Sequence, residues 1–131
     1  MAAKKLVLCI DDDEDILNSL AALLSSRGFR VERASSGAEA LEKFERVRPD
    51  FVICDLMMES ADTGLTLVRK MRSARAEIPI FLLSSVGAGL EQYADARQLG
   101  ISAVFQKPLD PAAILQALGA GASGEKGGRH G

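Results

Sequence analysis

Polar side chains suited to phosphoryl transfer stand where several apolar runs of this sequence end. They are Asp11 and Asp12 after residues 5–10, Asp55 after 51–54, Ser84 after 78–83, and Lys107 after 101–105. Carboxylates gathered in one place repel one another, so a cation should offset them. Mg²⁺ favours carboxylate, carbonyl and water oxygens and commonly bridges to phosphate. An aspartate held beside such a metal can act as a nucleophile and form an acyl phosphate.

The serine and the lysine fit the same reaction. A transferred phosphoryl group spreads negative charge over three equatorial oxygens, which must be compensated. Mg²⁺ would meet one oxygen, the Lys107 ammonium a second and the Ser84 hydroxyl a third. The chain's one histidine, His130, lies in a Gly-rich tail. Ser-His-Asp and Cys-His catalysis would need a histidine in the folded body, so the sequence argues against both.

The apolar runs alternate with helical patterns along the chain. Three continuous apolar runs are typical of strands buried on both faces: 5–10, 51–54 and 78–83. The alternating pattern of 29–34 predicts an edge strand, and the last strand is expected over 101–105. Helices are predicted from Ile16 to Gly28, from Ser36 to Val47, over 64–75, over 90–99, and from Asp110 to about Leu118. Acidic residues 13–15 complement the first helix dipole and are expected to have no catalytic role.

Five strand-helix pairs in strict alternation predict an α/β fold. The expected architecture is a (βα)5 doubly wound, parallel five-stranded sheet with the flavodoxin-like order 2-1-3-4-5. In such sheets ligands bind beyond the carboxyl ends of the strands, near the point where the strand order reverses. The polar side chains described above all come to that edge.

Length and composition favour one globular domain. The chain has 131 residues, is 47% hydrophobic and 26% charged, and carries a net charge of −2, which gives no electrostatic indication of nucleic-acid binding. We expect a domain over residues 4–118 and a disordered Gly-rich tail over 119–131. No apolar segment is long enough to span a membrane, and the N-terminal run is too short for a signal peptide, so a cytoplasmic location is expected. Cys9 and Cys54 are expected to be reduced core thiols, and the arginines of the 64–75 helix to be solvated.

The segments VLCIDDDEDIL, VICDLMM, PIFLLSS and FQKP resemble the signature segments of bacterial receiver domains of two-component response regulators. The resemblance covers residues 5 to 118. It implies that Asp11 and Asp12 hold Mg²⁺, that Asp55 is the phosphorylated residue beside the metal, and that the backbone carbonyl of Met57 is the remaining protein ligand. It further implies that Ser84 turns toward the phosphoryl group, that Lys107 is the family's invariant lysine, and that Pro108 often follows it in a cis peptide.

The resemblance also implies partners. The phosphoryl donor would be a phosphohistidine of a sensor histidine kinase or a histidine phosphotransfer protein, and the signal would pass to a downstream protein target. Such a chain is not an enzyme beyond catalysing its own phosphorylation and dephosphorylation. A homodimer through the fourth helix, the fifth strand and the fifth helix is a further expectation.

The sequence departs from the receiver pattern in two places. Glu59 replaces a usual proline and Gly64 comes one residue late, so the loop 58–63 is longer, which indicates either a distinct partner surface or a plain solvated insertion. Val104 occupies the position of the family's aromatic switch residue, and Phe105 is expected on the opposite face of its strand, in the core. Signalling would then depend on Ser84 and the segment 85–89.

Two other functions remain open at this point. The chain could be a pseudo-receiver that binds partners independently of phosphorylation. An aspartate-based phosphatase of the haloacid dehalogenase type also has a nucleophilic aspartate after a buried strand, but its signature needs a threonine or valine where this chain has Asp15.

Overall fold

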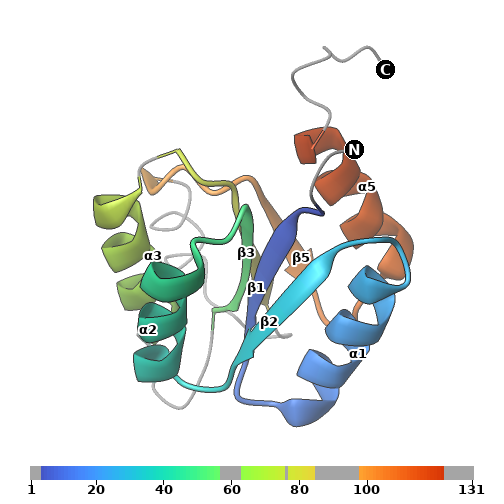
Figure 1. The fold of residues 1–131 in the computed structure, drawn as a ribbon, viewed down its shortest axis with the longest axis horizontal. Coiled ribbons are helices and arrows are strands. Elements are labelled where there is room, and N and C mark those ends of the chain that lie inside the picture. The colour runs from blue at the N-terminus through green and yellow to red at the C-terminus, as the bar shows by residue number, and fades with distance from the viewer. Residues whose placement is uncertain (1–3, 57–62, 76, 85–97, 123–131) are drawn as a thin grey trace.

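The computed structural model describes residues 4–56, 63–75, 77–84 and 98–122. Within these ranges five parallel strands form one sheet in the order β2-β1-β3-β4-β5, and helices cover both of its faces (Figure 1). The predicted fold class and strand order are therefore confirmed. The strands are β1 (Leu6–Ile10), β2 (Arg30–Ala34), β3 (Phe51–Asp55), β4 (Ile80–Ser84) and β5 (Ala103–Gln106).

Four helices lie in the described ranges. They are α1 (Glu14–Ser25), α2 (Gly37–Val47), α3 (Thr63–Ala74) and α5 (Pro111–Ala122). The helix predicted over 90–99 lies outside the described residues apart from its last two positions. Helix α5 continues four residues beyond the end expected at Leu118, although Gly119 is unfavourable in a helix interior by roughly 1 kcal/mol relative to alanine. The rest of the expected tail, 123–131, lies outside the described residues.

The predicted helix starts are formed by capping side chains. The Ser36 hydroxyl accepts a hydrogen bond from the Glu39 amide at 3.2 Å, and the Glu39 carboxylate accepts one in return from the Ser35 amide at 2.8 Å. Asp110 accepts from the amide of Ala112 at 3.1 Å. The bonds from the Glu39 and Ala112 amides satisfy donors that would otherwise have no partner in the first helical turn, and the bond from the Ser35 amide fixes the chain just before α2.

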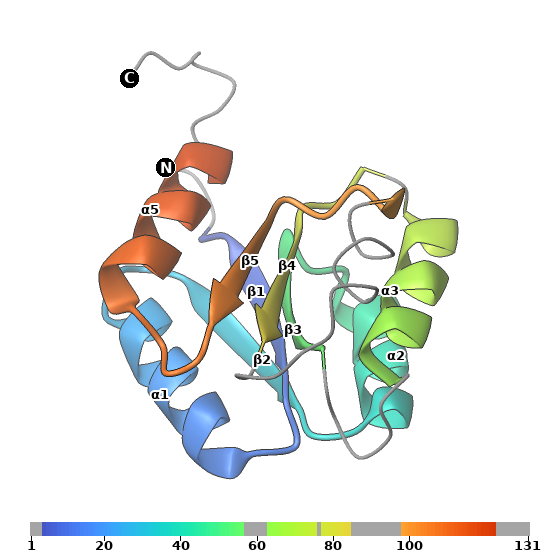
Figure 2. The same ribbon diagram turned by 180° about the vertical axis from the view of Figure 1, so that it is seen from behind.

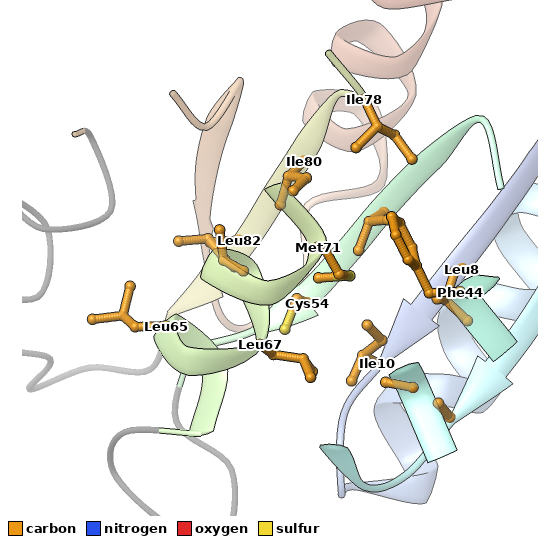
Figure 3. Packing of buried hydrophobic residues seen from close by; sticks show 14 of the residues in the cluster. Leu8, Ile10, Phe44, Cys54, Leu65, Leu67, Met71, Ile78, Ile80 and Leu82 are labelled. Atoms are coloured by element: carbon orange, nitrogen blue, oxygen red, sulfur yellow. The ribbon is translucent and has the colours of Figure 1, made fainter. Parts of the chain in front are cut away.

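The sheet separates two hydrophobic clusters. One contains Leu8, Ile10, Cys54 and Leu82 and packs under α2 and α3, as Figure 3 shows for the side chains of Phe44 and Met71 among others. The second lies under α1 and α5. Strands β1, β3 and β4 are buried along their whole length, because helices cover them on both sides.

The prediction that the arginines of the helix expected over 64–75 face solvent is wrong for two of the three. Arg72 donates hydrogen bonds to the backbone carbonyls of Leu99 and Gly100, both at 2.8 Å, and to that of Ile78. Arg75 donates to the Pro49 carbonyl at 2.8 Å, and its guanidinium lies 5.7 Å from the centroid of the Phe44 ring. A guanidinium has five donors in a planar fork, so these side chains can satisfy loop carbonyls that have no partner in the sheet. Arg69 is exposed, as expected.

Candidate functional site

The first acidic pair follows β1 directly. The Asp11 amide donates to the Ala34 carbonyl at 3.1 Å, which fixes the backbone at the start of the turn. The Asp11 side chain is fully buried, and its Oδ1 accepts a hydrogen bond from the Asp13 amide at 2.9 Å. Asp12 is exposed. Of the two neighbouring carboxylates, Asp11 therefore lies in the buried part of the site and Asp12 at its solvent-exposed rim.

Asp55 and Ser84 are the last residues of two adjacent central strands. The backbone register places Asp55 beside Leu83 and Ser84 beside Gln106. Asp55 is 1% exposed and Ser84 is fully buried. Because parallel strands end at the same edge of a sheet, Asp55 and Ser84 both come to the edge that holds Asp11. The predicted convergence of side chains is observed for Asp55, one oxygen of which lies within 4.8 Å of an Asp11 oxygen.

Lys107 follows β5, where its amide donates to the Ser84 carbonyl at 2.8 Å. Its Nζ lies 3.0 Å from Asp11 Oδ2 and 3.5 Å from Asp55 Oδ1, with 18% of the side chain exposed. Burial lowers the pKa of Lys107, but the close contact with the Asp11 carboxylate and the negative charges of Asp55 and Asp11 outweigh it, so the net pKa is raised. The ammonium is therefore held in its charged form between two carboxylates. The Lys107–Pro108 peptide bond is cis, as the resemblance implied.

The carboxylates form a group that fits a hard divalent cation. One oxygen each from Asp11, Asp12 and Asp55 lies within 4.8 Å of the other two. Asp11 Oδ2 is buried and, despite its short ion-pair distance to Lys107, has no hydrogen bond of acceptable geometry. A buried anionic oxygen without a hydrogen bond is costly, and oxygen donors of this kind are those that Mg²⁺ prefers. The expected fourth protein ligand, the Met57 carbonyl, lies outside the described residues.

Acidic residues 13–15 stay apart from this group. Asp13 is the N-cap of α1 and its side chain accepts a hydrogen bond from the Asp15 amide at 2.9 Å. Glu14 forms an ion pair with Arg33 at 3.1 Å. Glu14 and Asp15 lie in the first turn of α1, where their charges complement the helix dipole as predicted, whereas the N-cap role of Asp13 is an additional finding. The ion pair between Arg33 and Glu14 was not predicted, because the alternating pattern of β2 indicates only that the Arg33 side chain points away from the core.

The structure describes one of the two places where the sequence departs from the receiver pattern, the Val104 and Phe105 positions in β5, but not the loop after Asp55. Val104 packs with the cluster under α2 and α3, whereas Phe105 packs with the cluster under α1 and α5 and stacks on Phe81 with ring centroids 5.9 Å apart. The expected placement on opposite faces is therefore confirmed. The loop 58–62 and the segment 85–89 lie outside the described residues, so their expected roles stay predictions.

Comparisons with known proteins agree on one family. The family model described as the response regulator receiver domain matches residues 7–119. The transcriptional regulatory protein GlrR of Escherichia coli (strain K12) is 35% identical over 112 residues, which cover 86% of this chain and 25% of that protein. The response regulator MprA of Mycobacterium leprae (strain TN) is 42% identical over 79 residues, which cover 60% of this chain and 34% of MprA. The chain thus spans about a quarter to a third of the length of these bacterial relatives.

Solved structures give the same result. A CheY-like response regulator receiver domain protein from Methanospirillum hungatei JF-1 superposes with a TM-score of 0.86 at 27% identity, over 95% of this chain and 99% of that one. No helix within the described ranges is long and apolar enough to cross a membrane.

Proposed function

The chain belongs to the response regulator receiver family, and on that basis we propose that it accepts a phosphoryl group on Asp55 and signals by phosphorylation-dependent partner binding. The observation that carries the proposal is the Lys107 ammonium, 3.0 Å from Asp11 and 3.5 Å from Asp55, beside a buried Asp11 oxygen without a hydrogen bond. A merely structural ion pair would need one carboxylate. Here Lys107 contacts two carboxylates, and a third, Asp12, lies within 4.8 Å of both, so the group keeps an excess of negative charge that a divalent cation would offset.

In the proposed reaction an Asp55 carboxylate oxygen attacks the phosphorus atom of a phosphohistidine. A P–O bond forms and the P–N bond breaks, with its electron pair returning to the ring nitrogen. The other ring nitrogen of the phosphohistidine carries a proton throughout, so histidine leaves as neutral imidazole and Asp55 becomes an acyl phosphate. The donor would be a sensor histidine kinase or a histidine phosphotransfer protein. The buried position of Asp55 at the end of β3 fixes the direction of its carboxylate and keeps competing water away.

Other side chains of the site would compensate the charge of the phosphoryl group. Lys107 would turn one of its ammonium hydrogens from the carboxylates to a phosphoryl oxygen, and the Ser84 hydroxyl would donate to another. Asp11, Asp12, Asp55 and the Met57 carbonyl would hold Mg²⁺. When bound, Mg²⁺ supplies the positive charge that lets an anionic nucleophile approach an anionic phosphoryl group.

We propose that the signal leaves the domain through a protein target. The proposed region of change, and of a phosphorylation-dependent homodimer, comprises β5, α5 and the fourth helix that the sequence predicts over 90–99, as the family resemblance implies. Within the described ranges Cys9 and Cys54 are free and buried, which fits a reducing compartment and supports a cytoplasmic location.

The test is intact mass spectrometry after incubation with acetyl phosphate and Mg²⁺. The wild-type chain should gain about 80 Da, the mass of one phosphoryl group, and Asp55→Asn should gain nothing. Asp13→Asn is the matched control, because it also removes a carboxylate near the site but keeps a good N-cap residue, and it should gain the same mass as wild type. Wild-type protein that gains no mass from acetyl phosphate and does not bind beryllofluoride would support the pseudo-receiver alternative instead.

A further inference from the structure

Strand β2 is an edge of the sheet, and its outer side lies between α1 and α2 at the front of the molecule (Figure 1). The Arg30 amide donates to the Lys5 carbonyl and the Ala34 carbonyl accepts from the Asp11 amide, so both groups are directed to the β1 side. In a parallel ladder, alternate residues direct their backbone groups to the same neighbour. Val31 and Arg33 therefore direct theirs outward.

Several of the outward groups near β2 already have partners. The Arg33 carbonyl accepts a hydrogen bond from Lys43 Nζ, and the Ser35 amide donates to the Glu39 carboxylate at 2.8 Å. The Phe29 amide donates to the Leu24 carbonyl at 3.1 Å.

The unoccupied edge groups form a short ladder. In the described part of the chain β2 pairs with β1 alone. What remains for another strand is the amide and carbonyl of Val31, the amide of Arg33 and the carbonyl of Phe29.

We propose that the chain forms a homodimer by antiparallel pairing of two β2 strands, with Val31 opposite Val31 of the second copy. In this register Phe29 lies opposite Arg33, and Arg30 lies opposite Glu32. The two Val31 residues exchange a pair of backbone hydrogen bonds, and each Arg33 amide meets a Phe29 carbonyl of the other copy. The register leaves one bond unmade on each side of the two-fold axis, from the Phe29 amide to the Arg33 carbonyl, and these two groups already have partners within the chain.

The charges of Arg30 and Glu32 favour this register over registers shifted along the strand. Arg30 and Glu32 of the two copies face each other twice by symmetry, at positions where opposed strands come closest, and opposite charges across such a pair are stabilising. A shift by two residues would place Glu32 opposite Glu32 in one direction or Arg30 opposite Arg30 in the other, and like charges in these positions are destabilising. An open pocket of about 340 Å³, lined by Val31, Arg33 and Lys43 among others, gives room beside the strand for side chains of the second copy.

This contact is distinct from the proposed signalling surface. Strand β5 is the opposite edge of the sheet and, with α5, faces the viewer when the molecule is turned around (Figure 2). Pairing through β2 would therefore leave β5 and α5 accessible. Because few backbone bonds and side chains take part, the dimer should be weak, with a dissociation constant between about 1 μM and 1 mM.

Sedimentation equilibrium of the 131-residue chain tests the proposal. Arg30→Glu and Glu32→Arg each place like charges opposite one another, and each should weaken the dimer about tenfold or more. An equimolar mixture of the two variants restores both opposite-charge pairs and should associate about as strongly as wild type. Arg69→Glu on the exposed face of α3 is the control for net charge and should leave association unchanged.

Amide hydrogen exchange gives a readout that needs no variant. Exchange at Val31 and Arg33 of the wild-type chain should slow as the protein concentration rises, whereas exchange in β5 should not change. A chain that stays monomeric up to about 1 mM, an Arg30→Glu variant that dimerises like wild type, a mixture that does not associate, or concentration-independent exchange at Val31 would each overturn the proposal.

Discussion

Replacing Asp55 by asparagine should stabilise the metal-free protein, because the described charged side chains nearest to it, Lys107, Asp11 and Asp12, together repel its carboxylate more than they attract it. At an effective dielectric constant of about 20, the Lys107 ammonium at 3.5 Å attracts Asp55 by about 4.7 kcal/mol. Asp11 and Asp12, within 4.8 Å, each repel it by about 3.5 kcal/mol or more. Taken together, these terms give a net repulsion of about 2 kcal/mol. Asp12 is exposed, and halving its repulsion to allow for solvent screening lowers the net repulsion to about 0.5 kcal/mol. The Asp55→Asn variant should therefore be more stable by about 0.5–2 kcal/mol.

Bound Mg²⁺ should reverse this order. A ligand that binds only the folded state stabilises it by about 2.7 kcal/mol at a concentration 100 times its dissociation constant. The wild-type protein should gain most of this stabilisation, whereas Asp55→Asn lacks one anionic ligand and should gain much less.

Urea unfolding with and without Mg²⁺ measures both effects. Glu45→Gln is the matched control, since it removes one exposed carboxylate from α2, and its stability and Mg²⁺ response should equal those of wild type within about 0.5 kcal/mol. The reasoning would be refuted if Asp55→Asn destabilised the metal-free protein by more than about 1 kcal/mol, or if variant and wild type gained equally from Mg²⁺.

Three further predictions follow from buried or partly buried groups. Lys107→Met should lower the metal-free stability by about 2–3 kcal/mol in urea unfolding, because it leaves carboxylates without their counter-charge. The pKa of Lys107 is raised in the folded protein, so its contribution to stability is complete below the ordinary lysine value of 10.5 and is lost as pH rises through the folded value. The difference in stability from wild type should therefore shrink in strongly alkaline solution, and a pH-independent difference would contradict this. Arg72→Met should lower the free energy of unfolding by about 2–4 kcal/mol, because three backbone carbonyls lose a charged donor. Arg69→Met on the same helix should change it by less than about 0.5 kcal/mol, and equal effects of the two substitutions would refute the assigned contacts. Burial raises the pKa of Cys9 to about 12 and that of Cys54 further, so neither thiol should react with a disulfide reagent at pH 8 until urea unfolds the protein; rapid reaction of the native chain would show that the thiols are accessible.

Local sequence signals predicted much of the fold. The continuous apolar runs identified β1, β3 and β4, and the alternating run identified β2 as an edge strand, because burial on two faces and on one face leave different patterns. Capping residues such as Ser36 and Asp110 marked helix starts because their side chains bond amides only two or three residues away. The strand order then followed from connection rules that hold for alternating strands and helices.

The sequence was less informative where a side chain meets a distant backbone. Arg72 and Arg75 have the spacing of a solvated helix face, yet they bond carbonyls of loops that reach α3 only in the folded chain. The Arg33–Glu14 pair likewise joins residues brought together by the parallel pairing of β1 and β2.

The amino-acid order alone determined which residue types stand at the strand ends: Asp11, Asp12, Asp55, Ser84 and Lys107. Only the tertiary structure decided that Lys107 lies between Asp11 and Asp55 and that one Asp11 oxygen is buried without a hydrogen bond. The physical reason is that side-chain periodicity depends on local geometry, whereas distances across the edge of a sheet depend on strand register and on the packing of helices against both faces.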